Sequence, residues 1–209
     1  ELAETLSREN DYESQLNASR RWGREWHFRI GVHLLRGIIT PEIAGFQYGE
    51  LALVTLKELW SLVSSQFSKK YGLPPGRGAV LLGLGSLGTK RLHPKSDLDL
   101  ILVYDPAGIE ASVGKKEIDS RTYYARLTKA MVAAISAPMT EMSLFQVDMR
   151  LRPSGNQGPV ATSWESFKHY QTSEAWVWEH LALVNATIIT GPESLKADVS
   201  EFCKSLKTL

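Results

Sequence analysis

The sequence predicts an α+β protein in which helices pack on a small mixed β-sheet, with further helices at the N- and C-terminal ends. Three observations carry this prediction. Residues 11–36 and 41–71 place apolar side chains at helical spacing, two short apolar runs follow at 79–85 and 98–104, and the segment 144–152 alternates apolar and polar residues. A chain of 209 residues is long enough for one domain with a sizeable core.

The N-terminal part is predicted to contain two long helices. Residues 1–10 are polar and unpatterned, so we expect either a loose end or the frayed start of a helix there. Apolar residues recur every three or four positions over 11–36, which indicates the first helix. Thr40 is a good N-cap and Pro41 suits a first helical position, so the second helix should begin there and reach about Tyr71.

A segment rich in glycine and proline, GLPPGRG at 72–78, cannot continue a helix and marks a change of organisation. We therefore divide the chain into a helical N-terminal part, 1–72, and a catalytic core with C-terminal helices, 73–209. We expect the two parts to form one compact unit. The chain begins with Glu1 rather than Met, which favours a fragment of a longer protein, although a processed chain would look the same.

The core is predicted to combine strands and helices. The apolar runs AVLLGLG at 79–85 and LDLILVY at 98–104 indicate buried strands. After a polar loop, Ser120 is expected to cap a helix that Pro138 ends. The alternating segment LFQVDMRLR at 144–152 predicts a third strand with one strongly charged face. Two further helices are expected at about 163–172 and 174–187.

Composition excludes several classes of protein. Lys plus Arg number 24 against 23 for Asp plus Glu, and this net charge of +1 does not indicate a basic surface that would bind a nucleic acid. No apolar stretch approaches the roughly 20 residues that span a bilayer, so no membrane partner is expected. The single cysteine, Cys203, rules out an internal disulfide and a cysteine-rich zinc site, and it is compatible with a reducing cytoplasm, where we expect the protein to reside.

A glycine-rich turn follows the first predicted strand. Gly85, Ser86 and Gly88 would let backbone N–H groups approach an anion such as a phosphate closely. The spacing matches neither a Walker A loop nor a dinucleotide-binding G-x-G-x-x-G unit. Tight packing of the turn is the alternative interpretation.

Three aspartates make phosphate chemistry more plausible. Asp97 and Asp99 lie two residues apart at the start of the second strand, so both point to the same side. Asp148 lies on the polar face of the third strand. If the strands are neighbours, the three carboxylates converge, and such clusters hold paired magnesium ions in displacement reactions at phosphorus. The alternative is an edge strand that carries charges only to discourage aggregation.

Two other groups of residues are weaker candidates for a functional site. His93 and Asp97 are four residues apart, but no second histidine is nearby to complete a transition-metal site. Trp164, Trp176 and Trp178 could stack on an adenine, although aromatic residues on helices more often belong to the core.

Three stretches of the sequence carry a resemblance to a known family. The pattern GS, then SDLDL, then a later strand aspartate resembles the nucleotidyltransferase superfamily that includes DNA polymerase beta. More narrowly, GLGSLGTKRLHPKSDLDLILVYD, VDMRLRPSGNQGP and HYQTSEAWVWEHLALVNATIITG together resemble glutamine synthetase adenylyltransferase. The likeness covers most of residues 79–191 and implies a nucleotidyltransferase fold. Members of that family carry one half that attaches AMP to a tyrosine of glutamine synthetase and one that removes it, and EAWVWEH looks like the attaching half.

The resemblance implies roles for individual residues. Asp97, Asp99 and Asp148 would be the catalytic carboxylates and the ligands of two magnesium ions, with ATP as substrate. Asp148 would also help to ionise the tyrosine hydroxyl. A solvated basic strand end is the alternative interpretation of Arg150 and Arg152. The nucleotide-binding residues implied in this way are Gly85, Ser86, Ser96, Arg150 and Arg152.

The implied function is magnesium-dependent transfer of AMP from ATP to a tyrosine hydroxyl of glutamine synthetase, which would regulate nitrogen assimilation. The implied partners are glutamine synthetase and, through other regions of a full-length chain, a PII-type signal protein. Two alternatives stay open: phosphorolytic removal of AMP, and a nucleotide-binding regulatory domain without turnover. The second is motivated by three positions where this chain departs from the family pattern, namely Ser86, Asn185 and Thr187. Thr89 is a further departure from that pattern.

Overall fold

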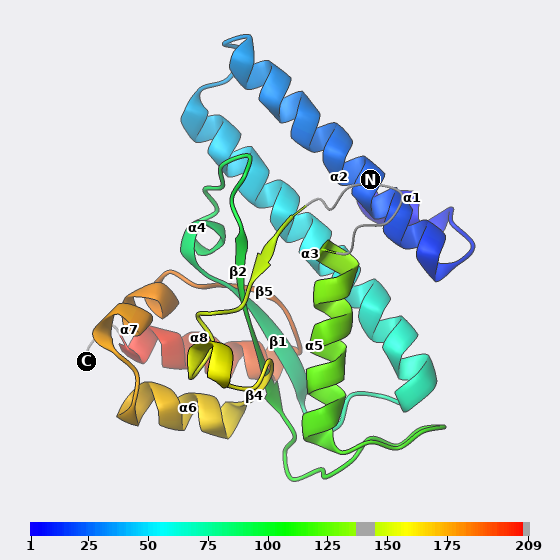
Figure 1. Cartoon of the computed structure of the whole chain (residues 1–209), viewed down its shortest axis with the longest axis vertical. Coiled ribbons are helices and arrows are strands. Elements are labelled where there is room, and N and C mark those ends of the chain that lie inside the picture. The colour runs from blue at the N-terminus through cyan, green and yellow to red at the C-terminus, as the bar shows by residue number, and fades with distance from the viewer. Residues whose placement is uncertain (137–144, 207–209) are drawn as a thin grey trace.

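The structure is a computed structural model that describes residues 1–136 and 145–206. In these residues eight α-helices surround a mixed sheet of five short strands, which confirms the α+β prediction (Figure 1). The helices are α1 (Leu2–Ser7), α2 (Tyr12–Leu35), α3 (Pro41–Tyr71), α4 (Gly85–Gly88), α5 (Ser120–Ser136), α6 (Trp164–Ser173), α7 (Val177–Val184) and α8 (Glu193–Ser205). The strands are β1 (Gly78–Gly83), β2 (Leu98–Asp105), β3 (Val147–Asp148), β4 (Thr162–Ser163) and β5 (Thr187–Thr190), and a short 3₁₀ helix, η1, spans Gly155–Gln157.

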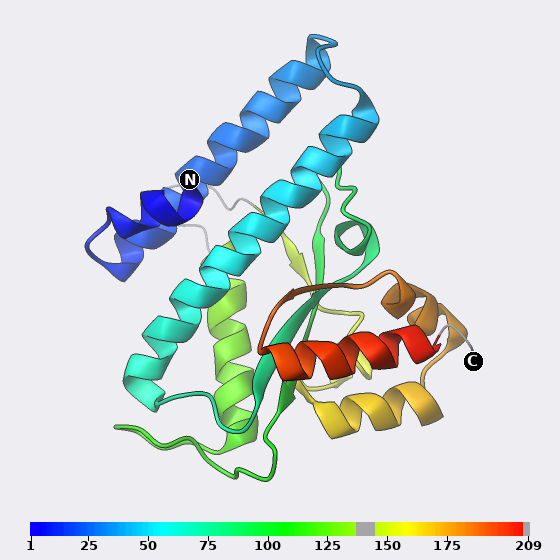
Figure 2. The same cartoon turned by 180° about the vertical axis from the view of Figure 1, so that it is seen from behind.

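Helices α2 and α3 form a long antiparallel pair at the N-terminal side of the molecule (Figures 1 and 2). The Thr40 hydroxyl caps α3 by accepting the Ile43 N–H at 3.4 Å, and Pro41 opens the helix as predicted. Of the two expectations for the first ten residues, the loose end is wrong, because residues 2–7 form a short helix of their own, α1. Leu2 and Leu6, one helical turn apart, are both buried in a small cluster with Ala18 of α2.

The sheet has the strand order β3-β2-β1-β5, and β4 also pairs with β2. Strand β1 is antiparallel to both β2 and β5, whereas β3 and β4 run parallel to β2. The two central strands are buried along almost their whole length, as their apolar sequences predict. This mixed pattern places the start of β2 beside β3, where the predicted carboxylates lie.

Two hydrophobic clusters cover the two faces of the sheet. Alternate residues of β1 point to opposite faces, so that Leu81 belongs to the cluster with α3 and α5, and Leu82 to the cluster with α6 and α8. Figure 2 shows α8 and α3 on different sides of the central strands. The sheet is therefore the middle layer between two sets of helices.

Several predicted elements differ in extent. The strand expected over 144–152 is limited to β3, because the Asp148 side chain accepts the N–H of Arg150 at 2.8 Å and starts a turn. The N-cap of α5 is Asp119 rather than Ser120, since its carboxylate accepts the Thr122 N–H at 2.8 Å. Leu144 and Pro138 lie outside the described residues.

The C-terminal part contains elements that the sequence analysis did not predict. The helix expected to run to residue 187 ends at Val184, and Thr187 begins β5, which pairs with β1. Helix α8 follows, with Leu195 and Val199 buried against the sheet. Among the described residues, no helix is both long enough and apolar enough to cross a membrane.

Candidate functional site

The sheet brings two of the three predicted aspartates into direct register. Asp99 lies in β2, and the parallel pairing with β3 sets it opposite Asp148. Asp97 is exposed and immediately precedes β2. Neighbouring residues of parallel strands project to the same face of a sheet, so the Asp99 and Asp148 carboxylates share one face. This is the convergence that the sequence predicted only on condition that the strands are neighbours.

The glycine turn lies against the Asp99 carboxylate. Gly85 has φ 54°, and a Cβ atom added to it would lie 2.5 Å from Asp99 Oδ2. The backbone N–H of Leu84, one residue earlier, donates to the carbonyl oxygen of Asp99 at 2.9 Å. Only a glycine allows both this backbone conformation and this close approach. The turn and the acidic strand are therefore one structural unit.

The surroundings of Asp99 and Asp148 shift the pKa values of the two carboxyl groups in opposite directions. Burial is the main cause that raises the pKa of Asp99, and the nearby Asp148 and Asp97 carboxylates raise it further. The hydrogen bond from the Arg150 side chain is the main cause that lowers the pKa of Asp148. The two carboxylates that face each other across the strands thus differ in their tendency to hold a proton.

Arg150 engages both oxygens of the Asp148 carboxylate. Its backbone N–H donates to Oδ1 at 2.8 Å, and its Nε donates to Oδ2 at 2.7 Å. The arginine side chain is 71% exposed. It therefore lies at the rim of the site, whereas the side chain of Asp148 is only 14% exposed.

The remaining predicted nucleotide-binding residues occupy different surroundings. Arg152 is only 8% exposed, and its guanidinium donates to the carbonyl oxygens of Met149 at 2.6 Å and Gly158 at 3.3 Å. The Ser96 hydroxyl accepts the N–H of His93 at 2.9 Å in the loop before β2. Ser86 is half-buried within α4. Contact of these residues with a nucleotide remains a prediction.

Within the described residues, no three His, Cys, Asp or Glu side chains are already placed to hold a metal ion. Arg150 occupies the oxygens of Asp148 that a metal would use. The donor set nevertheless fits magnesium chemically, because carboxylate oxygens are its preferred protein ligands. A divalent cation would also offset the charges of Asp148 and Asp97, which add to the effect of burial in raising the pKa of Asp99. The weaker transition-metal pairing of His93 with Asp97 gains no support among these residues.

Residues after α7 also contact the glycine turn. The Thr187 hydroxyl donates to the carbonyl oxygen of Gly88 at 2.8 Å, and a Cβ atom on Gly88 would lie 2.4 Å from the carbonyl oxygen of Asn185. Asn185 and Thr187 are two positions where the chain departs from the family pattern. No sequence signal indicated that they touch the turn.

The three tryptophans do not share one environment. Trp164 packs in the core with Phe167 and Phe202. Trp176 and Trp178, in contrast, are exposed at the start of α7, so the core interpretation is wrong for these two.

The arrangement defines a class of site: carboxylates from neighbouring strands beside a glycine turn are suited to reactions at phosphorus. The profile of the glutamate-ammonia ligase adenylyltransferase family, GlnE, matches residues 1–202. The chain therefore belongs to that family of nucleotidyltransferases, which confirms the resemblance and implies a nucleotide substrate. The family match alone does not separate the attaching from the removing half.

Relatives agree with this assignment. The chain is 43% identical over 199 residues to a protein of Mesorhizobium japonicum, which covers 95% of this chain and 20% of the relative. It is 42% identical over 202 residues to a protein of Agrobacterium fabrum, a match that covers 96% of this chain and 20% of the relative. It is 36% identical over 208 residues to a protein of Rhodopseudomonas palustris strain TIE-1, a match that covers 99% of this chain and 21% of the relative. Each is named a bifunctional glutamine synthetase adenylyltransferase/adenylyl-removing enzyme. The chain spans about a fifth of their length.

Proposed function

We propose that the chain carries a catalytic site that transfers AMP from ATP to a tyrosine hydroxyl of glutamine synthetase. The alignment of Asp99 with Asp148 beside Gly85 is the observation that carries this proposal. It sets acidic oxygens next to a turn that a phosphate can approach. The names of the relatives support glutamine synthetase as the acceptor.

In the proposed step the tyrosine oxygen attacks the α-phosphorus of ATP. A new phosphorus–oxygen bond forms, and the bond from the α-phosphorus to the bridging oxygen breaks, so that pyrophosphate leaves with the electron pair. The proton of the tyrosine hydroxyl passes to a carboxylate oxygen of Asp148. The depressed pKa of Asp148 is set mainly by Arg150, and departure of that arginine would make the carboxylate a better proton acceptor.

Asp97, Asp99 and Asp148 are the residues that would hold magnesium. The bound metal would neutralise charge on the phosphates and on the departing pyrophosphate. Arg150 would have to leave Asp148 when the metal is bound, and its exposed side chain is free to turn toward the triphosphate. The arginine thus has a role in both states: counter-charge to Asp148 without nucleotide, and phosphate ligand with it.

Transfer of radiolabel from α-labelled ATP to glutamine synthetase tests the proposal. We expect Asp99→Asn and Asp97→Asn each to abolish transfer. The matched control is Asp105→Asn, at the far end of the same strand, where the carboxylate pairs with Arg77 at 3.1 Å. Transfer by the Asp97 and Asp99 variants at the wild-type rate would refute the site, whereas loss in the Asp105 variant alone would point to a structural effect.

Removal of AMP is the second candidate activity, because the relatives are named for both directions. Adenylylated glutamine synthetase, incubated with the protein, phosphate and magnesium, distinguishes the two. Release of ADP without transfer from ATP would assign the removing role. The attaching role predicts the opposite pattern. Nucleotide binding in calorimetry with neither reaction would identify a regulatory domain without turnover.

A further inference from the structure

Two pairs of lysines from distant parts of the chain meet beside the end of α3. Lys69 and Lys70 belong to the last turn of that helix, and Lys115 and Lys116 lie in the loop between β2 and α5. All four are exposed, and all four line one cavity of about 640 Å³. Figures 1 and 2 both show the end of α3 and this loop at the same end of the molecule. The four residues therefore form one basic surface, which we call the lysine cluster.

A contact between two glycines holds the loop against the helix. A Cβ atom added to Gly114 would lie 2.5 Å from the backbone nitrogen of Gly72, and one added to Gly72 would overlap the carbonyl oxygen of Val113. Gly72 directly follows α3 and has φ 86°, a conformation that favours glycine. A side chain at either glycine would push the two segments apart. The backbone itself thus brings the two lysine pairs together.

The floor of the cavity is apolar and aromatic. Phe67 packs against Tyr71, with ring centroids 4.5 Å apart, and edge-on against Tyr123 of α5, at 5.0 Å. Tyr123 is completely buried, and its hydroxyl donates to the carbonyl oxygen of Gly72 at 2.9 Å. Lys70 lies over the Tyr71 ring, 5.2 Å from its centroid, and so connects the floor to the lysine cluster. The other apolar residues that line the cavity are Tyr12, Val63 and Ala130.

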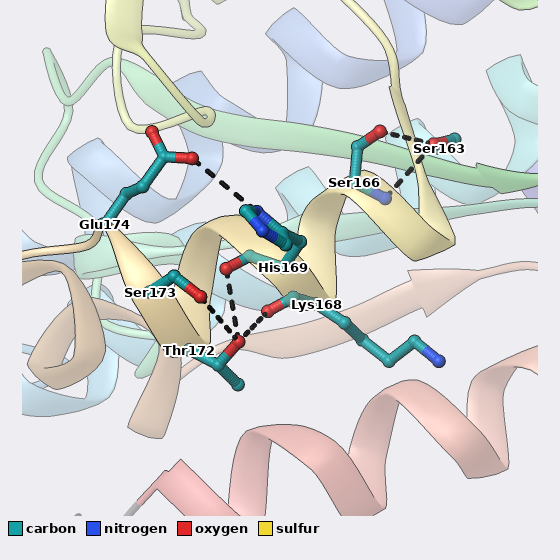
Figure 3. Close-up of polar contacts among 7 residues, drawn as sticks. All are labelled: Ser163, Ser166, Lys168, His169, Thr172, Ser173 and Glu174. Carbon is teal, nitrogen blue, oxygen red and sulfur yellow. Dashed lines mark hydrogen bonds and ion pairs between the residues drawn. The ribbon is translucent and has the colours of Figure 1, made fainter.

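The lysine cluster carries charge that the protein does not neutralise. Several basic groups elsewhere are paired: Lys90 lies 3.1 Å from Glu50, and the His169 ring lies 3.6 Å from the Glu174 carboxylate at the end of α6, as Figure 3 shows. Within residues 1–136 and 145–206, by contrast, none of the four lysines forms an ion pair. Because like charges repel, gathering them is unfavourable until an anion binds. The cluster is therefore complementary to a negatively charged partner.

The lysine cluster is remote from the acidic site. Asp99 lies at the start of β2, whereas the loop that carries Lys115 leaves the same strand after Asp105. A strand rises about 3.3 Å per residue, so these two ends of β2 are roughly 20 Å apart. A ligand at the lysine cluster would therefore occupy a second site, separate from the carboxylates.

The apolar floor and the lysines together favour an acidic protein segment as the ligand. The floor suits an apolar side chain, while the lysines around it attract carboxylates on either side of that side chain. Lysine ammonium groups are point charges on flexible stems, so they can follow several carboxylates of an irregular segment. A nucleic acid would need a longer basic surface than a chain with a net charge of +1 indicates.

We propose that the cavity between α3, α5 and the loop at 113–116 is a docking site for an acidic segment of a partner protein. The segment places an apolar side chain on the aromatic floor and its carboxylates against the lysine cluster. Docking there tethers the partner to this end of the molecule and leaves the acidic site open. The proposal does not depend on AMP transfer.

Fluorescence anisotropy tests the docking site with a fluorescein-labelled peptide that has one phenylalanine between two runs of four glutamates. We expect Lys115→Gln combined with Lys116→Gln to weaken binding roughly 3- to 30-fold, the combined range for two exposed ion pairs. The matched control is Lys57→Gln combined with Lys204→Gln, which removes two exposed lysines outside the cavity and lowers the net charge equally. Equal affinity of the two double variants, or no binding by the wild-type protein, would overturn the proposal.

Altered peptides test the charges and the floor separately. Glutamine in place of every glutamate should abolish binding, and serine in place of the phenylalanine should weaken it, because the apolar contact is lost. Gly114→Ala keeps all four lysines but forces the loop away from Gly72, so it should also weaken binding of the parent peptide while the circular dichroism spectrum stays unchanged. Full binding by Gly114→Ala, equal binding of the three peptides, or tighter binding of single-stranded DNA or of phosphatidylserine vesicles would each contradict the proposal.

Discussion

The carboxylate of Asp99 lies half-buried against Gly85, with Asp97 and Asp148 as its acidic neighbours. Burial and these neighbours raise its pKa, so the folded protein binds the Asp99 proton more tightly than the unfolded chain does. The stability that Asp99 contributes is therefore complete below its ordinary pKa of 3.8 and is lost as the pH rises through the raised value. At neutral pH without metal, the ionised group destabilises the fold.

Asp99→Asn should therefore stabilise the protein while abolishing AMP transfer. In buffer with EDTA at pH 7 we expect the Tm to rise by roughly 1–3 °C, a change that corresponds to a fraction of a kcal/mol to about 1 kcal/mol in a chain of this size. The gain should shrink as the pH is lowered toward 4, because the wild-type carboxyl is then protonated. Thermal unfolding followed by circular dichroism measures both effects. A lower Tm for the variant at pH 7 would contradict the electrostatic argument.

Arg150 should compete with metal for Asp148. Replacing it with glutamine removes the counter-charge and frees both carboxylate oxygens. We expect Arg150→Gln to bind Mn²⁺ roughly tenfold more tightly without nucleotide, since a hydrogen bond to a charged group no longer has to be broken. Electron paramagnetic resonance of free Mn²⁺ measures this directly. Arg126→Gln, on α5 near Tyr71, is the control; unchanged or weaker binding by the Arg150 variant would exclude competition.

At the scale of elements, α4 and β2 are joined through Gly85. Gly85→Ala should lower stability by about 1–2 kcal/mol for its left-handed φ, and the new Cβ would also displace the Asp99 carboxylate. Gly108→Ala is a matched control, because its φ of 79° imposes similar strain with no atom near the added Cβ. We expect both variants to lose stability in urea titrations and only Gly85→Ala to lose transfer. Equal transfer in the two variants would argue against the contact.

Some elements could be predicted from local signals and others could not. Helix α3 carries a good cap and a long apolar stripe, although two glycines, Gly45 and Gly49, fall in its first turns. The structure explains Gly49, where an added Cβ would lie 2.6 Å from the carbonyl oxygen of Lys90. At Gly45 an added Cβ would make only an ordinary contact, 3.5 Å from the carbonyl oxygen of Leu92. Glycines that admit a distant segment look, in sequence, like helix breakers.

The C-terminal elements show a different difficulty. The run TIIT at 187–190 is β-branched and precedes a Gly-Pro pair, which is a strand signal, yet it directly follows an apolar helix without a clear break. The long strand predicted at 144–152 failed because its polar alternation arises from a turn at Asp148 and a loop closed by Arg152. Periodicity alone does not distinguish a strand from the end of a helix at 184–187, or a strand from a turn and loop at 148–152.

The acidic site was predictable in composition and not in geometry. Spacing alone placed Asp97 and Asp99 on one strand, but only the parallel pairing of β2 with β3 shows that Asp148 faces Asp99. The contact of Gly85 with Asp99, and the hydrogen bond from Thr187 to Gly88, join residues that are distant in sequence. Such contacts depend on topology, which no local pattern encodes.

At the scale of the whole molecule, the N-terminal helices and the sheet share one hydrophobic cluster. Leu56 of α3 is completely buried in it, together with Leu81 of β1 and Leu100 of β2. The division of the chain at residue 72 remains a prediction. Shared burial of this kind favours a single cooperative unit over two independently stable parts, because neither part could bury these side chains alone.

Leu56→Ala should therefore weaken both parts together. We expect it to lower the free energy of unfolding by about 2–5 kcal/mol, the usual cost of a cavity at a fully buried leucine. Leu35→Ala, at an 89% exposed position at the end of α2, should change stability by no more than about 0.5 kcal/mol. Urea unfolding, followed by tryptophan fluorescence and by circular dichroism, should give one transition whose midpoint shifts equally for both probes. Two separate transitions, with only one shifted by Leu56→Ala, would instead mean that the helical part and the core fold independently.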